Sequence, residues 1–257
     1  MRITLFILAL TGGWLLASCQ MNEPKSAASE EVSTQALGYQ MIDTIREFIV
    51  EEGSEGYVRI ELAFPSFYGP DYAEDLNRLV ASKLWAQNRT TGRSWQEQMS
   101  FFIDQYKELQ SEVEYVQPWT HKESLSIRRL DEHVLTLERE YSEYSGGAHG
   151  RHETHYYNFD VATGDTLLLD DLIKPGAREA VEALVDFHYR EQQGIDAEAS
   201  LIDEAGLNVA SIPLTENFAL DEKGIRFFYN PYEIAAYAAG AIMVDVPMTD
   251  LANYLLD

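Results

Sequence analysis

The first half of the chain shows one strand pattern followed by two helical patterns. Apolar and polar residues alternate from Tyr57 to Phe64, which predicts a strand that ends at Pro65. Beyond it, apolar residues recur every three or four positions, which predicts two amphipathic helices. These helices cover residues 72–86 and 95–110. Ser94 and Glu97 have the spacing of a capping box, which marks the start of the second helix.

After Pro118 the pattern becomes mainly that of a β-sheet. Strand candidates separated by turn residues cover 123–128, 133–144, 155–161, 166–169, 212–220, 224–229 and 242–246. Residues 160–164 (Asp-Val-Ala-Thr-Gly) predict a turn, and one helix is predicted between Ala177 and His188. We therefore expect an α+β fold, with a small N-terminal α/β module followed by an antiparallel, meander-rich β-sheet domain that carries one packed amphipathic helix.

The N-terminus has the features of an export signal. An apolar run of 14 residues extends from Ile3 to Leu16, shorter than the roughly 20 residues of a membrane-spanning helix. The sequence Leu16-Ala17-Ser18-Cys19 resembles the lipobox of bacterial lipoproteins, in which the cysteine is lipidated and becomes the first residue. Acyl chains on Cys19 would anchor the mature protein to a membrane. The alternative is an ordinary signal peptide followed by an incidental cysteine.

These patterns divide the chain into four segments. We predict a lipoprotein signal peptide at 1–18, a lipid-anchored flexible tether at 19–38, an α/β module at 39–118 and a β-rich domain at 119–257. The tether is rich in small and polar residues and has no apolar period. Both domains are therefore expected outside the cytoplasm, in the cell envelope, held by the lipid anchor.

Composition limits the partners that this chain can have. The 43 acidic and 19 basic side chains give a formal net charge of −24, which becomes −25 if residues 1–18 and their single charge, Arg2, are removed. A field of this sign repels nucleic-acid phosphates and attracts cationic partners. The single cysteine excludes an internal disulfide and any multi-cysteine metal site.

Three histidines, His149, His152 and His155, form the densest group of potential metal ligands. In an extended strand the first and last would be roughly 20 Å apart, and the middle one would point to the opposite face. We therefore expect solvated or hydrogen-bonded histidines rather than a zinc site, and no cofactor. The run His152-Glu-Thr-His155 is one residue shorter than the metalloprotease helix motif.

Two further stretches are unusual. Ser145-Gly-Gly-Ala-His-Gly150 permits positive φ values and suits a tight hairpin loop, a partner-contact loop or, least well, a serine nucleophile. No complete catalytic motif is present in the sequence, so we expect no enzymatic activity. The second stretch, Asn230-Pro-Tyr-Glu-Ile-Ala-Ala-Tyr-Ala-Ala-Gly240, places two tyrosines either against the sheet or on a binding surface.

These two stretches, together with Asp160-Val-Ala-Thr-Gly164 and Leu169-Asp-Asp-Leu172, resemble the RsiV/PdaC-type extracytoplasmic domain. This domain occurs in anti-sigma factors of the RsiV type and before the catalytic domain of the peptidoglycan deacetylase PdaC, and the resemblance covers residues 56–256. It implies a receptor for lysozyme, which the RsiV domain binds. The partner-contact positions that it nominates are Ser145, Gly146, Gly147, His149, Pro231, Tyr232, Glu233 and Tyr237.

Two departures limit what the resemblance implies. RsiV has a cytoplasmic sigma-binding segment and a spanning helix, whereas this chain has a lipobox, so sigma-factor control is not implied. PdaC has a separate metal-dependent deacetylase domain for which no length remains here, so deacetylation is not implied. Two hypotheses follow: a membrane-anchored binding module for lysozyme or another cationic wall-active protein, and a peptidoglycan-binding or peptidoglycan-modifying protein.

Overall fold

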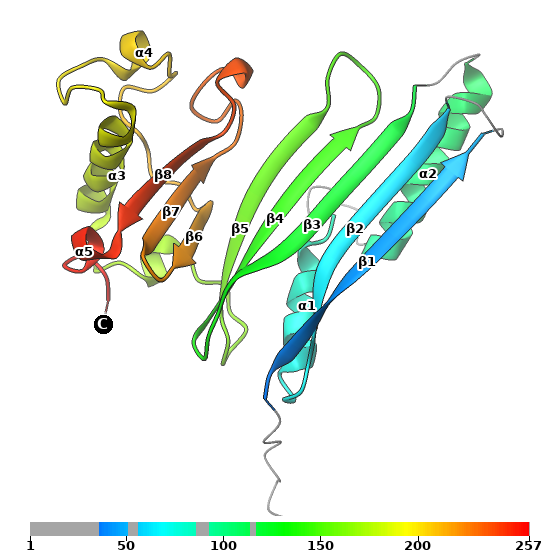
Figure 1. Ribbon diagram of the computed structural model, residues 1–257, viewed down its shortest axis with the longest axis horizontal. Helices are drawn as coiled ribbons and strands as arrows, with labels where there is room; N and C mark the ends of the chain where they lie inside the picture. The colour runs from blue at the N-terminus through cyan, green and yellow to red at the C-terminus, as the bar shows by residue number, and fades with distance from the viewer. Residues whose placement is uncertain (1–35, 51–55, 86–92, 114–116, 257) are drawn as a thin grey trace, which may run out of the picture. The chain divides into compact units, whose positions relative to one another are not determined.

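The computed structural model describes residues 36–50, 56–85, 93–113 and 117–256 (Figure 1). The predicted signal peptide, Cys19 and most of the predicted tether lie outside these residues. The described chain contains a five-stranded mixed sheet and a three-stranded antiparallel sheet with helices packed against them. The expected α+β fold class is confirmed.

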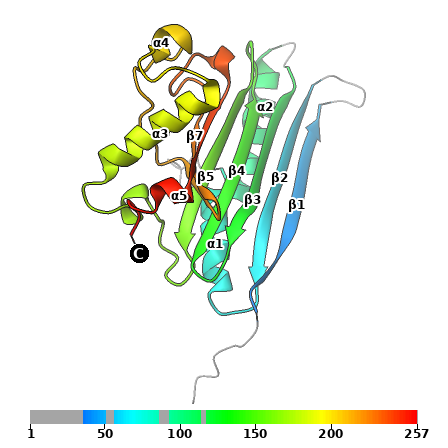
Figure 2. The same ribbon diagram turned by 60° about the vertical axis from the view of Figure 1, so that its left-hand side comes forward.

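The larger sheet has the strand order β1-β2-β3-β4-β5, and only the β2–β3 pair is parallel. Its strands are β1 (Gly38–Ile49), β2 (Tyr57–Tyr68), β3 (Trp119–Leu130), β4 (Val134–Tyr144) and β5 (Arg151–Asp160). Between β2 and β3 the chain forms α1 (Ala73–Lys83) and α2 (Trp95–Glu112). Figure 2 shows both helices on one face of this sheet.

Two apolar cores lie between this sheet and its helices. Leu76 and Val80 of α1 pack with Leu125, Leu135 and Leu137 of the middle strands. A second core joins α2 to β2 and consists of the buried residues Val58, Ile60, Leu62, Trp85, Met99, Phe102 and Tyr106. Because apolar side chains alternate along these strands, the opposite face of the sheet keeps its polar side chains.

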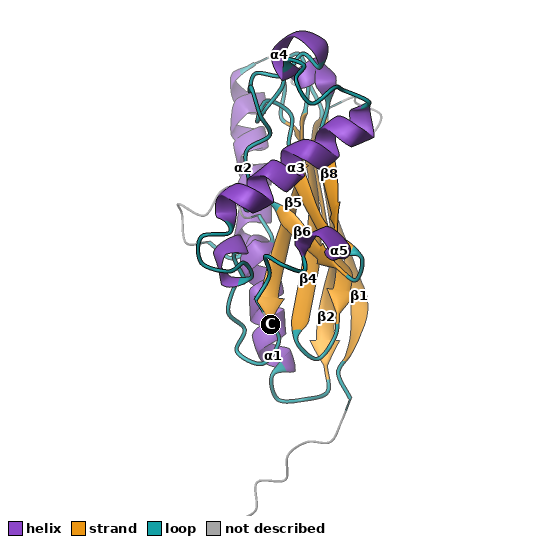
Figure 3. Ribbon diagram, turned by 90° about the vertical axis from the view of Figure 1, so that its left-hand side faces the viewer, coloured by secondary structure: helices purple, strands orange, loops and turns teal. Residues whose placement is uncertain are grey.

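The smaller sheet has the order β6-β7-β8 and carries the amphipathic helix α3. Its elements are α3 (Arg178–Gln193), α4 (Leu201–Glu204), β6 (Phe218–Asp221), β7 (Gly224–Tyr229), β8 (Ile242–Pro247) and α5 (Met248–Leu251). Two 3-10 turns, η2 (Leu169–Asp171) and η3 (Tyr237–Ala239), lie in the connections. Val181 and Val185 of α3 are buried against Phe227 and Val244 of the strands. Figure 3 shows α3 as the longest helix of this region.

Asparagine side chains form hydrogen bonds with backbone groups at the outer edge of β5. The Thr154 N–H donates to Asn230 Oδ1 (2.8 Å), and the Tyr156 N–H donates to Asn217 Oδ1 (2.8 Å). Both asparagine amides in turn donate to the Thr154 carbonyl. Asn158 is buried, and its side-chain nitrogen donates to the Phe218 carbonyl of β6 (2.8 Å). The edge of the larger sheet is therefore joined to the smaller sheet by side chains rather than by a strand ladder.

Several boundaries differ from the sequence predictions. The strand β1 was not predicted, and β2 continues past Pro65 because that residue lies in the ladder opposite Met41. Residues 166–169 form an isolated bridge and a 3-10 turn instead of a strand, since only Thr166 pairs with Phe159. Of the predicted strand 212–220, only the part from Phe218 onward is extended in the ladder.

The change of pattern at residue 118 does not interrupt the sheet. β2 lies before this point and β3 lies after it, yet Val58 to Ala63 pair in parallel with Trp119 to Ser124. The segments 39–118 and 119–257 therefore share one five-stranded sheet. A parallel strand pair requires a crossover connection, which α1 and α2 supply here. No helix among the described residues is long and apolar enough to cross a membrane.

Candidate functional site

Residues 145–150, which we call the glycine loop, connect β4 to β5, and two of their glycines have a positive φ. Gly146 and Gly147 have φ values of +100° and +97°, which glycine adopts without the clash that a Cβ would cause. The Tyr144 hydroxyl donates to the Gly147 carbonyl (2.9 Å) and fixes the loop to the end of β4. Ser145 and His149 are exposed at its two ends.

Residues 230–240, which we call the tyrosine loop, follow β7, and hydrogen bonds between Asn230 and Glu233 close the first turn of this loop. The Asn230 N–H donates to Glu233 Oε2 (2.9 Å), and the Glu233 N–H donates to the Asn230 carbonyl (3.1 Å). Tyr232, between them, has a φ of +76° and is 65% exposed. A bulky residue in this conformation is uncommon and requires a surrounding structure that fixes it. The loop thus presents the Tyr232 ring to solvent.

The two loops meet through their aromatic rings. The His149 and Tyr237 ring centroids are 5.1 Å apart with an interplanar angle of 23°, and those of Tyr237 and Tyr232 are 5.3 Å apart with an angle of 32°. We call His149, Tyr232 and Tyr237 the aromatic cluster. It borders a depression of about 300 Å³, whose lining includes Pro231. Nominated residues from both stretches, His149 from the first and Tyr232 and Tyr237 from the second, therefore meet on one surface although they are far apart in the sequence.

The remaining nominated residues have different places. Ser145, Gly146 and Gly147 belong to the same loop as His149 but do not line the depression. Glu233 closes the tyrosine loop through its bond to Asn230.

A second depression, which we call the sheet groove, adjoins the first and shares His152, Glu153 and Pro231 with it. It has a volume of about 410 Å³. Its floor is the polar face of the larger sheet, because directly opposite residues on neighbouring strands share a face. These floor residues are Lys122, Ser124, Glu140, Ser142, His152 and Thr154. Phe228 of β7 and Asn230 form part of its wall.

The three clustered histidines have separate surroundings. His149 stacks on Tyr237, and its Nδ1 lies 3.0 Å from the Gly150 carbonyl. His152 lines the sheet groove, and His155 Nε2 lies 3.0 Å from Glu153 Oε2. No group of three or more His, Cys, Asp or Glu side chains suited to hold a metal ion occurs in the described part of the chain.

A buried ionic network in the larger sheet was not predicted from the sequence. His121 is fully buried, with Nε2 3.2 Å from Glu123 Oε2 and Nδ1 3.1 Å from Glu143 Oε2. Arg139 forms an ion pair with Glu123, and the Trp85 N–H donates to both Glu123 oxygens (3.0 Å each). The Trp85 ring stacks on His121 at 3.7 Å between centroids. This arrangement satisfies the buried charges, which would otherwise destabilise the fold.

The network shifts the pKa values of its members in opposite directions. Burial disfavours the imidazolium, but hydrogen bonds and charge attraction from Glu123 and Glu143 outweigh burial and raise the pKa of His121. Burial likewise disfavours the Glu123 carboxylate, but His121 and Arg139 lower the pKa of Glu123. The signal in the sequence was the alternation Trp119, His121, Glu123, Leu125, which puts the polar pair on the buried face once the strand is extended back to residue 119.

Two protein families match separate parts of the chain. Residues 51–152 match the family described as "Deacetylase PdaC", and residues 170–249 match the family described as "Protein of unknown function (DUF3298)". The chain carries a PdaC-type domain and a DUF3298 domain. The aromatic cluster draws on both, because His149 lies in the PdaC-type domain and the two tyrosines lie in the DUF3298 domain.

Solved structures share this fold. A DUF3298-family protein from Bacteroides fragilis has a TM-score of 0.73 and 20% identity, and the match covers 88% of this chain and 96% of that one. A DUF3298-family protein from Pseudomonas aeruginosa PAO1 has a TM-score of 0.69 and 19% identity, with 86% and 95% covered. No curated protein sequence matches the chain. The fold of this chain is therefore shared by solved structures of the DUF3298 family.

Proposed function

We propose that this protein is a membrane-anchored extracytoplasmic binding module that captures lysozyme or another cationic wall-active protein. The observation that carries the proposal is the aromatic cluster, in which loops from both domains place the exposed His149 and Tyr232 beside the half-buried Tyr237. The anchor in this proposal is a lipid on Cys19, which lies outside the described residues.

The chemistry of the cluster suits a protein partner. Tyrosine rings contribute a large contact area at a small cost in side-chain entropy and are enriched in protein interfaces. The adjoining sheet groove contains Glu140, whose carboxylate accepts from Ser124 Oγ at 3.4 Å and has no cationic partner among the described residues. A lysine or arginine of the partner would complement it, and the net charge of −24 would accelerate encounter at low salt.

Titration calorimetry of the full chain in detergent with lysozyme tests the proposal. We expect binding that weakens as salt increases, and a dissociation constant at least about tenfold higher for Tyr237→Ala, because hot-spot tyrosines commonly contribute this much. Phe187→Ala is the matched control, since this exposed ring lies on α3 and outside the cluster. Absence of binding at low salt to lysozyme and to other basic wall-active proteins would reject the proposal.

A second candidate is peptidoglycan binding. The hydroxyl groups on the floor of the sheet groove lie beside aromatic rings, an arrangement that can hydrogen-bond and stack on a sugar. A pull-down of the same chain with purified wall fragments and with basic proteins separates the two candidates. Retention on wall fragments that His149→Ala abolishes, without capture of any basic protein, would favour this alternative.

A further inference from the structure

The strand β1 is a long free edge of the larger sheet. Its 12 residues pair with β2 in an unbroken register, from Gly38 opposite Tyr68 to Ile49 opposite Tyr57. Among the described residues no backbone hydrogen bond reaches its outer side, and Figures 1 and 2 show it as the last strand of the sheet. It contains no proline and no bulge, two of the features by which proteins block such edges, and its charged side chains are Asp43, Arg46 and Glu47.

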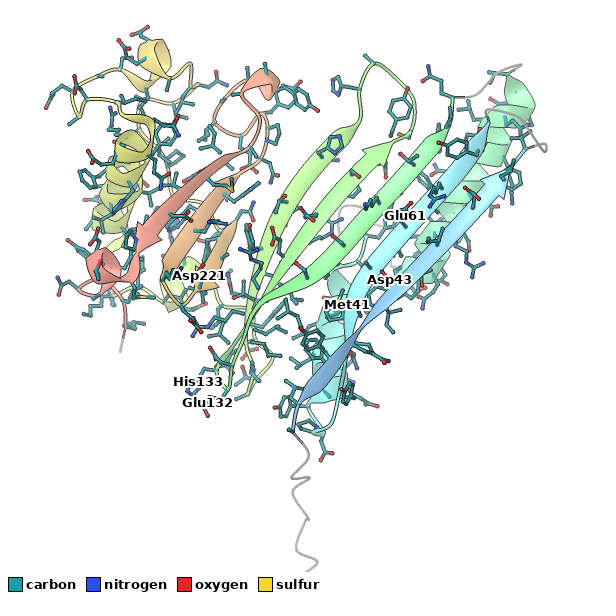
Figure 4. All side chains as sticks on the ribbon, in the orientation of Figure 1. Met41, Asp43, Glu61, Glu132, His133 and Asp221 are labelled. Atoms are coloured by element: carbon teal, nitrogen blue, oxygen red, sulfur yellow. The ribbon has the colours of Figure 1, made fainter. Side chains whose placement is uncertain are left out.

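The side chains of β1 divide between the two faces of the sheet. Phe48 packs toward α2, where its ring meets that of Tyr106, and Phe64, opposite Ile42, packs in the same core, so the even-numbered residues from Ile42 to Phe48 face the helices. The odd-numbered residues share the polar face with Arg59, which is paired with Glu47 at 3.4 Å. On this face Met41, Ile45 and Ile49 are 45%, 59% and 51% exposed. Figure 4 shows Met41 and Asp43 on β1, with Glu61 on the neighbouring strand.

We infer that β1 pairs with β1 of a second copy of this chain. The apolar residues are spaced symmetrically about Ile45, so an antiparallel pair related by a two-fold axis at that residue matches like with like. In this register Ile45 lies opposite Ile45 of the second copy, and Met41 lies opposite its Ile49. On the other face Ile42 lies opposite Phe48. The two five-stranded sheets become one sheet of ten strands, and the outer backbone groups of both edges are satisfied.

In this register the stability of the dimer depends on the charges of its side chains. Asp43 lies opposite Glu47 of the second copy, twice in the dimer, and like charges directly opposite each other are destabilising. Glu47 is compensated by Arg59, whereas Asp43 has no cationic partner among the described residues. The dimer is therefore expected to strengthen with salt and with Asp43→Asn, which removes one charge from each pair.

Disulfide cross-linking tests the register. In the full chain with Cys19→Ser, an introduced cysteine is the only thiol. Directly opposite residues of antiparallel strands have Cα atoms about 4.5–5.5 Å apart, within the range that a disulfide spans. We expect Ile45→Cys to yield a disulfide-linked dimer on oxidation. Asp43→Cys is the control, because residues 43 of the two copies would lie roughly 13 Å apart along the strands. Equal cross-linking at both positions, or none at position 45, would overturn the inference.

Sedimentation velocity in detergent tests the association without cross-linking. We expect a concentration-dependent dimer whose dissociation constant rises about tenfold or more with Ile45→Lys, which puts two like charges at the two-fold axis, and falls with Asp43→Asn. Ile45 is exposed in the single chain, so its replacement leaves the fold intact, which circular dichroism verifies. A chain that stays monomeric at its highest soluble concentration, or a dimer insensitive to both variants, contradicts the proposal.

Discussion

His121 illustrates how one buried residue controls a group of charges. With the imidazole protonated, the network contains two cations, His121 and Arg139, and two anions, Glu123 and Glu143. Loss of the proton leaves a net negative charge among groups that are mostly buried, which is unfavourable in a low-dielectric interior. The raised pKa of His121 expresses this preference for the charged form.

The pH dependence of stability follows from that shift. Because the folded-state pKa of His121 is raised above its ordinary value of 6.5, its contribution is fully present below about pH 6.5 and is lost as pH rises through the folded pKa. We expect the free energy of unfolding to decline over this interval in urea titrations. The decline should disappear in His121→Gln and persist in His133→Gln, since His133 is exposed at the β3–β4 turn, labelled in Figure 4. An unchanged profile in His121→Gln would contradict the assignment.

Among the helices, α2 begins where its local sequence specifies. The Ser94 side chain accepts from the Glu97 N–H, and the Ser94 N–H donates to Glu97 Oε2 (2.7 Å), so the predicted capping box is confirmed. The N–H bond from Ser94 lowers the pKa of the Glu97 carboxyl. This cap orients the helix that covers β2 with Met99 and Phe102.

Removal of the cap should weaken this helix. We expect Ser94→Ala to lower the free energy of unfolding by about 1 kcal/mol, because the cap bond is lost while the burial of the helix is unchanged. Ser100→Ala is the control, since Ser100 is exposed and its hydroxyl bonds back to the Gln96 carbonyl within the helix. Chemical denaturation of the two variants should therefore differ, and equal stabilities would show that the capping box contributes nothing.

At the scale of the whole described molecule, Asn158 joins the two sheets. Its side-chain oxygen accepts from Thr136 Oγ1 (2.9 Å) and from the Leu220 N–H (3.3 Å), while its nitrogen donates to the Phe218 carbonyl. All of these groups are buried. The aromatic cluster lies on loops from both sheets, so its geometry depends on this connection.

Asn158→Ala should therefore destabilise the fold more than a surface asparagine does. We expect a loss of about 2 kcal/mol or more, because several buried partners are left unsatisfied. Asn208→Ala is the matched control, since this residue is exposed and bonds to Ile234 through its backbone N–H. Thermal unfolding of both variants checks the expectation, which fails if Asn158→Ala unfolds at the same temperature as Asn208→Ala.

Local signals determined the elements that the sequence predicts well. The strand β7 has the bounds expected from its apolar alternation and flanking turns, and α3 follows from spacings of three and four. In contrast, β1 escaped prediction because an edge strand with both faces partly exposed carries a weak alternation. The prediction that the strand ends at Pro65 was also wrong, because this proline is tolerated in β2, where it lies opposite Met41.

By itself the sequence determined the α+β class, the cap of α2 and the two unusual loops, because each depends on residues close together in the chain. Only the tertiary structure decided that the PdaC-type domain includes a parallel β2–β3 pair, that His121 lies between two carboxylates, and that His149 meets Tyr237. These features depend on residues brought together by the crossover and by the asparagine bridges. Such long-range contacts leave no periodic trace in a single sequence.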